Sequence, residues 1–382
     1  MATTNPTLIA GKLYIVESKA NEVTAYLRPN PSFGVSFDQI QPFTPDPYRP
    51  FTNLLVSYSA SYLHERQHKR ELRLESAKGA TEIAESQQGD LERNLLYTLR
   101  NAFVQALQAK AIYKLVTDNL SYYDNVLDVS RDRFRAGDIA KIDLDRLILQ
   151  RVQFETDVQN ATVSVRTAKI QLLMLLNDRT PVDQFDVTGT FDFQDQALPL
   201  QQFHTEALSS RPDLRAAIQT VEKAKVDHTL AIANGSTDPV FGTDLGRNPP
   251  LDAYMGINIS IPLRIFDRNQ GEKQRTATDI TRNERLRDAA EAQVYSDVDS
   301  AFATLNSNLA LLRLYKSTYL DTAVTVRDTI SFSYQRGGAS LLDFLQAQQD
   351  YRSVELGYLN LIGSYMTSAN QLNFAVGTEV VH

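Results

Sequence analysis

The sequence predicts a mainly α-helical chain with a smaller β part, arranged as an internal tandem repeat of residues 1–197 and 198–382. Two observations predict this fold. In each half a long segment with apolar residues three and four apart follows a glycine turn, and short segments with period-two alternation precede it. The first spacing is that of a coiled-coil seam, and the second is that of a strand with two different faces. The order of these elements occurs twice, which indicates a duplication.

Each half contains a helical hairpin whose tip is a glycine turn, at Gly137 and at Gly337. The first seam consists of Leu144, Leu147, Arg151, Phe154, Val158, Ala161, Val165, Ala168, Leu172 and Leu175. The second consists of Phe344, Ala347, Tyr351, Val354, Tyr358, Leu361, Tyr365, Ser368, Leu372 and Ala375. An acid, Asp143 or Asp343, stands immediately before each seam. We therefore expect two similar hairpins with an acidic group beside each tip.

Four segments read as strands, near residues 32–38, 54–63, 239–246 and 254–264. In the last of them Met255, Ile257 and Ile259 alternate with Gly256 and Asn258. Helices are expected over residues 5–28, 64–133, 199–234 and 267–336, and over a return segment that ends near residue 176, because prolines and glycines punctuate the sequence between them. The expected order is helix, strand, strand, long helix, tip, return helix, and then the same again.

Composition excludes several classes of protein. The chain has 382 residues and a formal net charge of -7, and it contains no cysteine. A nucleic-acid binder needs a basic face, and thiolate metal sites and disulfides need cysteine, so we expect none of these. No apolar run reaches the ~20 residues that a membrane-spanning helix needs. No phosphate-binding glycine loop, nucleophile elbow or paired acid and base is present, so we expect neither an enzyme nor a cofactor.

The four strands point to a membrane. Strands of about ten residues, apolar on one face and small or polar on the other, have the pattern of a transmembrane β-barrel with a wet lumen. Four strands cannot close a barrel, and an open sheet edge is not tolerated in lipid. Three chains would supply about twelve strands, enough for a closed barrel. The long helices would then continue as a tube, with the glycine tips roughly 100 Å away.

The beginning of the chain differs from the middle. An amphipathic lead-in over residues 198–208 precedes Arg211–Leu214 in the second half, whereas the matching Asn5–Leu8 follows Met1 almost directly. No signal-peptide pattern is present at the start. We expect that the natural chain begins upstream and carries an export signal.

These motifs together resemble those of the TolC-like outer-membrane factors. The resemblance rests on Asn5–Leu8, Arg211–Ala217, the strand-to-helix passage Pro262–Asn269, and the tip motifs Phe134–Ile139 and Tyr334–Asp343. It covers essentially the whole chain, including the duplication. It implies a homotrimer with a barrel of twelve strands and twelve long helices, located in the outer membrane and periplasm of a Gram-negative bacterium.

The resemblance also implies partners. A periplasmic membrane-fusion adaptor would dock at the tip, followed by an inner-membrane efflux pump, and outer-membrane lipid would surround the barrel. The general character is closest to the channels that serve resistance-nodulation-division (RND) efflux, metal-exporting systems included. An alternative is the outer-membrane duct of a type I protein secretion system.

The candidate gate lies after the second tip. The family's aperture acids stand in an Asp-Val-Leu-Asp motif, and here Asp343 matches the first acid while Gln346 replaces the second. Asp143 and Asp145 of the first half are candidates to compensate. Three copies of Asp343 would form a ring that favours cations. The alternative for Asp343, and the more probable reading for Asp143, is an acid that complements the helix dipole.

The tips themselves are candidate adaptor contacts. Gly137 and Gly337 read as positive-φ turn residues on an exposed tip. Arg135 and Arg336 would pair with adaptor groups or cap helix carbonyls, and Ser340 belongs to the same turn.

One motif supports a rival function. His64-Glu65-Arg66-Gln67-His68 matches H-E-x-x-H, the zinc-binding helix of metalloproteases. Its position at the expected start of a charged helix favours a solvated collar near the membrane interface over a zinc site, with His64 and His68 as weak metal ligands. A third alternative, a water-soluble coiled-coil scaffold, explains the seams but not the two-faced strands.

Overall fold

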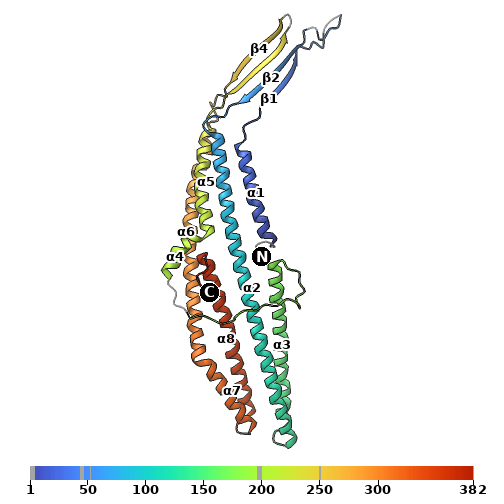
Figure 1. The fold of residues 1–382 in the computed structure, drawn as a ribbon, viewed down its shortest axis with the longest axis vertical. Coiled ribbons are helices and arrows are strands. Elements are labelled where there is room, and N and C mark those ends of the chain that lie inside the picture. The colour runs from blue at the N-terminus through green and yellow to red at the C-terminus, as the bar shows by residue number, and fades with distance from the viewer. Residues whose placement is uncertain (1–4, 44–46, 52, 196–199, 249–250, 382) are drawn as a thin grey trace. The chain divides into compact units, whose positions relative to one another are not determined.

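The structure is a computed structural model that describes residues 5–43, 47–51, 53–195, 200–248 and 251–381 (Figure 1). Its helices are α1 (Pro6–Tyr26), α2 (Lys69–Ala136), α3 (Lys141–Leu176), α4 (Leu200–Ser210), α5 (Pro212–Asn234), α6 (Gln270–Leu314), the π-helical turn η1 (Tyr315–Tyr319), α7 (Leu320–Gln335) and α8 (Leu341–Val376). Its strands are β1 (Ser32–Asp38), β2 (Leu55–Leu63), β3 (Val240–Asn248) and β4 (Leu251–Ser260). The prediction of a mainly helical chain with four strands is confirmed. The first residues of the expected lead-in, 198 and 199, lie outside the described residues.

The chain forms two compact units, and each takes segments from both halves of the sequence. The first unit comprises Met1–Gly11, Gln88–Pro212 and Glu291–His382, and the second comprises Lys12–Gln87 and Asp213–Ala290. These units differ from the tandem division at residue 197, which describes the repeat in the sequence and stays a prediction. The second unit holds the sheet, and the first holds both hairpin tips.

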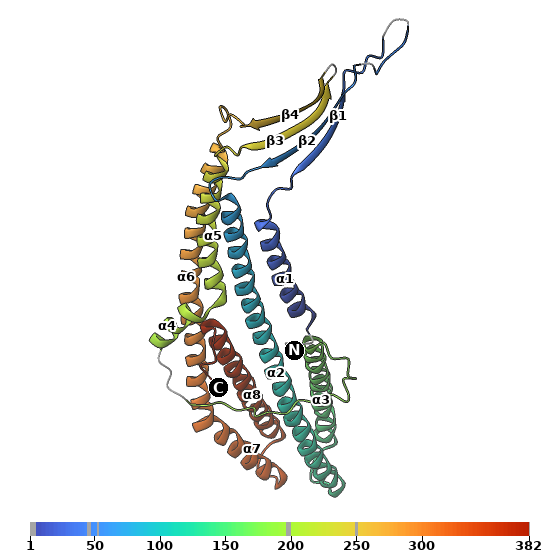
Figure 2. The same cartoon turned by 45° about the horizontal axis from the view of Figure 1, so that its top comes forward.

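The sheet of the second unit is antiparallel, in the order β1-β2-β3-β4 (Figure 2). Its register keeps side chains of one kind on one face, because Val35 pairs with Tyr58, Tyr58 with Leu245, and Leu245 with Met255. The opposite face carries serines and glycines, and Ser36 and Ser57 share a hydrogen bond of 2.8 Å across the strands. The two-faced pattern of the sequence is therefore present in the sheet.

The apolar face of the sheet is exposed. Phe33 is 72% exposed, Met255 is 70% exposed and Ile257 is 81% exposed. The alternation in the sequence predicts a strand that continues to residue 264, but strand β4 ends at Ser260. The reason is Pro262, which has no N–H to donate to a neighbouring strand. In one chain, β1 and β4 are the unpaired edges of this sheet.

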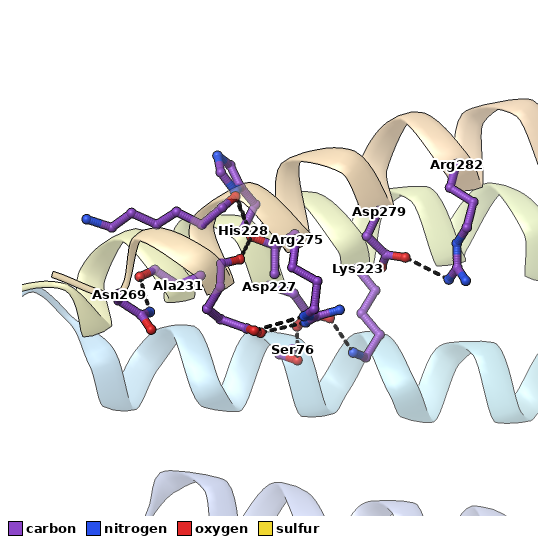
Figure 3. Close-up of polar contacts among 12 residues, drawn as sticks. Ser76, Lys223, Asp227, His228, Ala231, Asn269, Arg275, Asp279 and Arg282 are labelled. Carbon is purple, nitrogen blue, oxygen red and sulfur yellow. Dashed lines mark hydrogen bonds and ion pairs between the residues drawn. The ribbon is translucent and has the colours of Figure 1, made fainter. Parts of the chain in front are cut away.

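Polar contacts connect three helices of the second unit, α2, α5 and α6 (Figure 3). Asp227 of α5 accepts hydrogen bonds from Ser76 Oγ of α2 and from Lys223 Nζ, the latter at 2.7 Å. His228 Nδ1 lies 2.9 Å from Thr276 Oγ1 of α6, and Asn269 Nδ2 donates to the carbonyl of Ala231 at 2.7 Å. These bonds fix the rotation of each helix about its axis, since several of them are partly buried.

The first unit contains two helical hairpins, one from α2 and α3 and one from α7 and α8. The first predicted seam buries Leu147, Phe154, Ala161 and Ala168, which are seven residues apart, and also Leu172. Arg151, which interrupts that seam, bonds Asp124 of α2 through Nε at 2.5 Å, so it connects the two helices of the hairpin. In the second seam Phe344, Ala347, Tyr365, Ser368, Leu372 and Ala375 are buried.

The structure breaks two expected helices. Residues 199–234 form α4 and α5 in place of one helix, because Pro212 disfavours helical geometry at Arg211 and has no N–H of its own. The buried Arg211 bonds Asp297 at 2.9 Å. The second long helix is interrupted at η1, where Tyr315 stacks near Tyr358 and approaches Gly357 so closely that a Cβ there would lie 3.0 Å from the tyrosine hydroxyl. A π-helical turn adds one residue to the helix and turns the following side chains to a new face.

Both hairpin tips are closed by the same backbone motif. Gly137 has φ +86° and Gly337 has φ +79°, both in the left-handed region. Asp138 N donates to the Arg133 carbonyl at 2.9 Å, and Gly338 N donates to the Ser333 carbonyl at 2.8 Å. These are the six-to-one hydrogen bonds of a Schellman motif, which is favoured by glycine at the left-handed position.

An irregular segment crosses α2 and α3 after the first hairpin. Its Asp186 accepts hydrogen bonds from Lys110 Nζ of α2 at 2.9 Å, and it lies 3.1 Å from Lys169 Nζ of α3. The hydrogen bond from Lys110, with that from Lys169, lowers the pKa of Asp186 to about 2. One carboxylate therefore fastens the segment to both helices.

Replacing Gly137 by alanine tests the tip geometry. A Cβ at Gly137 meets nothing within 4 Å, so the cost of Gly137→Ala is the backbone strain of a left-handed alanine, about 1 kcal/mol. Thermal unfolding of the purified protein, followed by circular dichroism, should show a lower Tm. Gly338→Ala is the matched control, because Gly338 has ordinary φ and room for a Cβ. Equal Tm values for the two variants would contradict the Schellman assignment.

Replacing Asp186 by asparagine tests the segment's attachment. Because the folded-state pKa of Asp186 lies below its usual 3.8, its charge stabilises the fold above about pH 4, and this contribution is lost as the pH falls towards 2. Asp186→Asn should therefore lower Tm at neutral pH, with the difference from the unmodified protein vanishing near pH 2. Asp183→Asn, in the same segment and highly exposed, is the control. A pH-independent difference would assign the effect to packing instead of charge.

Candidate functional site

The candidate site is the pair of hairpin tips in the first unit, where the structure brings together most of the residues singled out from the sequence. A buried apolar cluster supports it from behind and draws side chains from both hairpins. Its buried members are Tyr123, Val126, Leu127, Leu147, Phe154, Tyr334 and Phe344. The rings of Tyr334 and Phe344 stack with centroids 4.9 Å apart, and those of Tyr123 and Phe154 at 4.4 Å. The tips are thus held on one common core.

The two acids beside the tips have different surroundings. Asp343 closes a capping box: its Oδ2 accepts hydrogen bonds from Ser340 N at 3.2 Å and Ser340 Oγ at 2.7 Å, and its own N–H donates to Ser340 Oγ at 3.1 Å. Asp143 has no such cap, since Ala140 occupies the corresponding N-cap position, and its nearest cation is Arg146 at 3.9 Å. The capping box fixes Asp343 at the exposed start of α8, so its carboxylate has a defined position.

Gln346, which replaces the second acid of the aperture motif, is exposed on α8 one turn beyond Asp343. Its Nε2 donates to Asp350 Oδ1 at 2.8 Å. Asp145 is half-buried on α3. Asp343 and Asp143 thus stay the candidates for a charged ring, with Gln346 contributing polarity without charge.

The tip arginines make local contacts. Arg135 pairs with Asp132 at 2.9 Å, with both side chains 76% exposed, and the guanidinium of Arg336 lies 4.3 Å from the ring centre of Phe332. In the structure neither of them caps a helix carbonyl. That role belongs to Arg133, whose Nη1 donates to the Tyr334 carbonyl at 2.8 Å and so joins the first hairpin to the second. Sequence reasoning missed Arg133 because its partner is a backbone atom two hundred residues away, which leaves no local pattern.

Two further arginines connect the hairpins above the tips. Arg352 of α8 forms an ion pair with Asp157 of α3, and its guanidinium lies 4.5 Å from the ring centre of Phe154. Arg327 of α7 lies over Tyr351 of α8 at 3.9 Å and over Tyr122 of α2 at 5.3 Å. Such contacts gain strength where solvent is excluded. Any movement of one hairpin against the other has to break them.

The carboxyl group of Glu355 lies near Arg327. Burial raises the pKa of Glu355, and the nearby Arg327 opposes that rise. Burial also raises the pKa of the Tyr351 phenol. The charge of Arg327 therefore lies among groups that favour their neutral forms, with Asp328 as its ion-pair partner at 2.8 Å.

The zinc-site hypothesis at residues 64–68 fails on geometry. The prediction that this stretch begins the long helix is wrong: α2 begins at Lys69, and Gln67 and His68 have φ of 59° and 56°. His64 and His68 therefore do not lie one helical turn apart, which H-E-x-x-H zinc binding requires. Glu65, the would-be catalytic acid, is held by Arg73. Among the described residues, no group of three or more metal-ligating side chains is present.

Within the part of the chain that the structure describes, no helix is both long and apolar enough to cross a bilayer.

The known proteins to which this chain is similar are all related to outer-membrane efflux. Residues 204–378 match the family model described as outer membrane efflux protein. The cobalt-zinc-cadmium resistance protein CzcC of Cupriavidus metallidurans is 23% identical over 81% of this chain and 74% of its own length. The outer membrane protein TolC of Vibrio cholerae is 21% identical over 80% of this chain and 72% of its own length.

Solved structures share the fold. The structure of CusC superposes with a TM-score of 0.83 and 16% identity, covering 99% of this chain and 90% of that one. The outer-membrane channel OprN superposes with a TM-score of 0.81 and 16% identity, covering 98% and 88%. The predicted resemblance to the TolC-like outer-membrane factors is thereby confirmed by the family model, the two relatives and the shared fold.

Proposed function

We infer that this protein is the outer-membrane duct of a tripartite efflux system, a passive exit channel gated at its hairpin tips. The observation that carries this inference is the sheet of the second unit, which has one exposed apolar face, one small and polar face, and two unpaired edges. An apolar sheet face of this kind is suited to lipid, and lipid does not tolerate unpaired edges.

Association of three copies resolves the edge problem. If β1 of one chain pairs with β4 of the next, every backbone N–H and C=O of the sheet gains a partner, and the polar face lines a lumen. Three chains of four strands close a barrel of about twelve, and their hairpins stand around one axis. The need to pair these backbone groups and the resemblance to outer membrane efflux proteins both support the proposed homotrimer.

The tips form the gate and the docking surface in this proposal. Asp343 is held by its capping box, so three copies present three carboxylates at a fixed height around the aperture. Like charges repel when the pore narrows, and a ring of them favours cations. Gly137, Gly337 and the exposed Arg135, Arg336 and Ser340 form the surface for a periplasmic adaptor, which connects the duct to an inner-membrane pump.

The pump determines the cargo, because a duct passes whatever is delivered to it. The printed name of CzcC concerns resistance to cobalt, zinc and cadmium. Divalent metal cations delivered by an RND-type pump are therefore the first cargo class to test. The type I secretion alternative would be supported if the duct restored protein export, and not metal resistance, to a strain that lacks its own outer-membrane factor.

Single-channel recording tests the gate. The purified trimer in a planar bilayer should conduct with a preference for cations, and Asp343→Ala should raise the conductance or weaken the cation preference. Asp343→Asn preserves the shape of the capping side chain and so separates charge from helix capping. Asp183→Ala, an exposed acid outside the tips, is the control.

The outcomes separate the parts of the proposal. Conductance and selectivity unchanged in both Asp343 variants would remove this residue from the gate. A purified protein that forms no channel at all, and that stays monomeric in detergent, would overturn the duct.

A further inference from the structure

Cations gather where the helices of the second unit meet its sheet. Arg28 lies on the connection from α1 to β1, and Arg66 on the connection from β2 to α2. Arg264 and Arg268 lie on the connection from β4 to α6, and Arg70 lies in the first turn of α2. Three of the four helix–strand connections of the unit thus carry arginine.

The acids of this junction are already engaged. Glu65 is held by Arg73, and Glu71 by Arg70 at 2.8 Å. Asp238, on the connection from α5 to β3, accepts from Lys69 Nζ at 2.6 Å and from Arg66 N at 2.9 Å. Lys69 is only 4% exposed, so this ion pair is a fixed internal strut. Asp267, on the connection from β4 to α6 with Arg264 and Arg268, accepts from Asn269 N at 2.8 Å, whereas the two connections that carry Arg28 and Arg66 contain no acid besides Glu65.

Four arginines of the junction stand outside these ion pairs. Within the described residues, Arg28, Arg66, Arg264 and Arg268 form no ion pair with a carboxylate. The Nε of Arg264 is buried without a hydrogen-bond partner, although a buried donor of this kind is normally satisfied. The junction thus has an excess of positive charge, and the Nε of Arg264 has an unused N–H. Both features favour binding of an anion.

Part of this excess surrounds a hollow. A cavity of about 480 Å³ is lined by Arg28, Arg66, Lys69 and Arg70, by Tyr62, His64, Gln67 and His68, and by the two paired acids Glu65 and Glu71. Arg70 is steadied there by Tyr26, since its guanidinium lies 4.3 Å from the ring centre. Guanidinium groups bind phosphate oxygens through paired N–H donors, and a size of about 480 Å³ lies in the range of small-ligand sites.

Apolar side chains adjoin the same junction. Just beyond β4, Leu263 is 79% exposed, Ile265 is 61% exposed and Phe266 is 90% exposed, and these residues alternate with the polar Arg264. Arginines beside exposed apolar residues, at the end of two-faced strands, are characteristic of the boundary between hydrocarbon and water. The hollow itself is lined by Tyr62 of β2, and the same strand exposes Tyr58 on the apolar face of the sheet, so a phospholipid, which has both a phosphate and acyl chains, suits this place better than a soluble anion.

We propose that this hollow is a binding site for the phosphate headgroup of an anionic phospholipid in the periplasmic leaflet, with Arg28 and Arg66 as its principal ligands. The inference rests on the proposed function, in that the sheet has to cross the outer membrane for the junction to lie at the leaflet surface. Arg70 supplies a third guanidinium, and the Lys69–Asp238 strut keeps Arg66 at the rim of the hollow. The lipid would fix the depth of the duct in the membrane.

Lipid binding by the purified full chain tests this site. Phosphatidylglycerol, phosphatidylethanolamine and inorganic phosphate are titrated separately into the detergent-solubilised protein, and bound lipid is measured by native mass spectrometry. We expect phosphatidylglycerol to bind more tightly than phosphatidylethanolamine. The double variant Arg28→Gln/Arg66→Gln should weaken phosphatidylglycerol binding about 30-fold. Arg66→Lys, which keeps the charge, should retain most of the affinity.

The control removes two exposed arginines elsewhere in the same unit. Arg282→Gln/Arg285→Gln changes the net charge by the same amount on α6, where these side chains are exposed and pair with Asp279 and Asp288. It should leave lipid binding unchanged. An equal loss in both double variants would mean attraction by net charge only, and equal binding of the two lipids would mean no headgroup site. Inorganic phosphate that displaces the lipid at equal concentration would mean a site for free phosphate; each of these three results overturns the proposal.

Failure of this inference can be told from failure of the duct. If the protein inserts into phosphatidylethanolamine vesicles and conducts, but shows no preference for phosphatidylglycerol, then only the lipid site is refuted. If it enters no bilayer of either composition, the proposed function fails first and the lipid site with it.

Discussion

The structure depends on one constraint: a sheet of four strands with one apolar face cannot satisfy its two edges alone. Strand β1 and strand β4 each present a row of backbone groups with no partner in the chain. Water would satisfy those groups but not the exposed apolar face, and lipid would suit the face but not the groups. In the proposed trimer, pairing of β1 with β4 of the next copy meets both demands.

The position of the two helical hairpins along each other depends on different interactions from those that pair the strands. Apolar seams determine which faces of a hairpin meet, but partly buried arginines determine how far one hairpin lies along the other. Arg133, Arg327 and Arg352 each reach from one hairpin to the other within the first unit. These contacts are directional, so they favour a small number of discrete arrangements of the tips over continuous sliding. A gate built from such hairpins would switch between defined states.

Much of this fold could be predicted from the sequence, because the information was periodic. Burial of Leu147, Phe154, Ala161 and Ala168 follows directly from the heptad spacing, and the two faces of the sheet follow from alternation. The two features that the sequence did not predict, the turn η1 and the non-helical H-E-x-x-H stretch, depend on single contacts and not on a periodic pattern. The turn η1 depends on Tyr315 fitting over Gly357, and the non-helical H-E-x-x-H stretch depends on left-handed Gln67 and His68, which propensity disfavours.

In the candidate site, too, the repeated features could be predicted from the sequence and the single contacts could not. Glycine turns and the acids beside them were visible because they occur twice, but the duplication concealed a difference. The side chain of Asp343 is held by Ser340 at the N-cap of α8, whereas the N-cap of α3, three residues before Asp143, is Ala140, which has no side-chain group to form a cap. The residues that join the hairpins were invisible, since an arginine bonding a distant carbonyl leaves no spacing to recognise. Duplicated sequences thus predict equivalent backbones more safely than equivalent side-chain roles.

Cysteine cross-linking between the sheet edges tests the central claim most directly, because the chain contains no cysteine of its own. A series of pairs with one cysteine in β1 and one in β4, such as Ser36→Cys with Asn258→Cys and neighbouring registers, is oxidised in outer-membrane fractions. Ser36→Cys with Ser57→Cys, which face each other within one chain, is the positive control for oxidation. The account predicts that at least one register gives covalent trimers on a denaturing gel. If the control pair oxidises while every edge pair stays monomeric, the shared barrel is wrong.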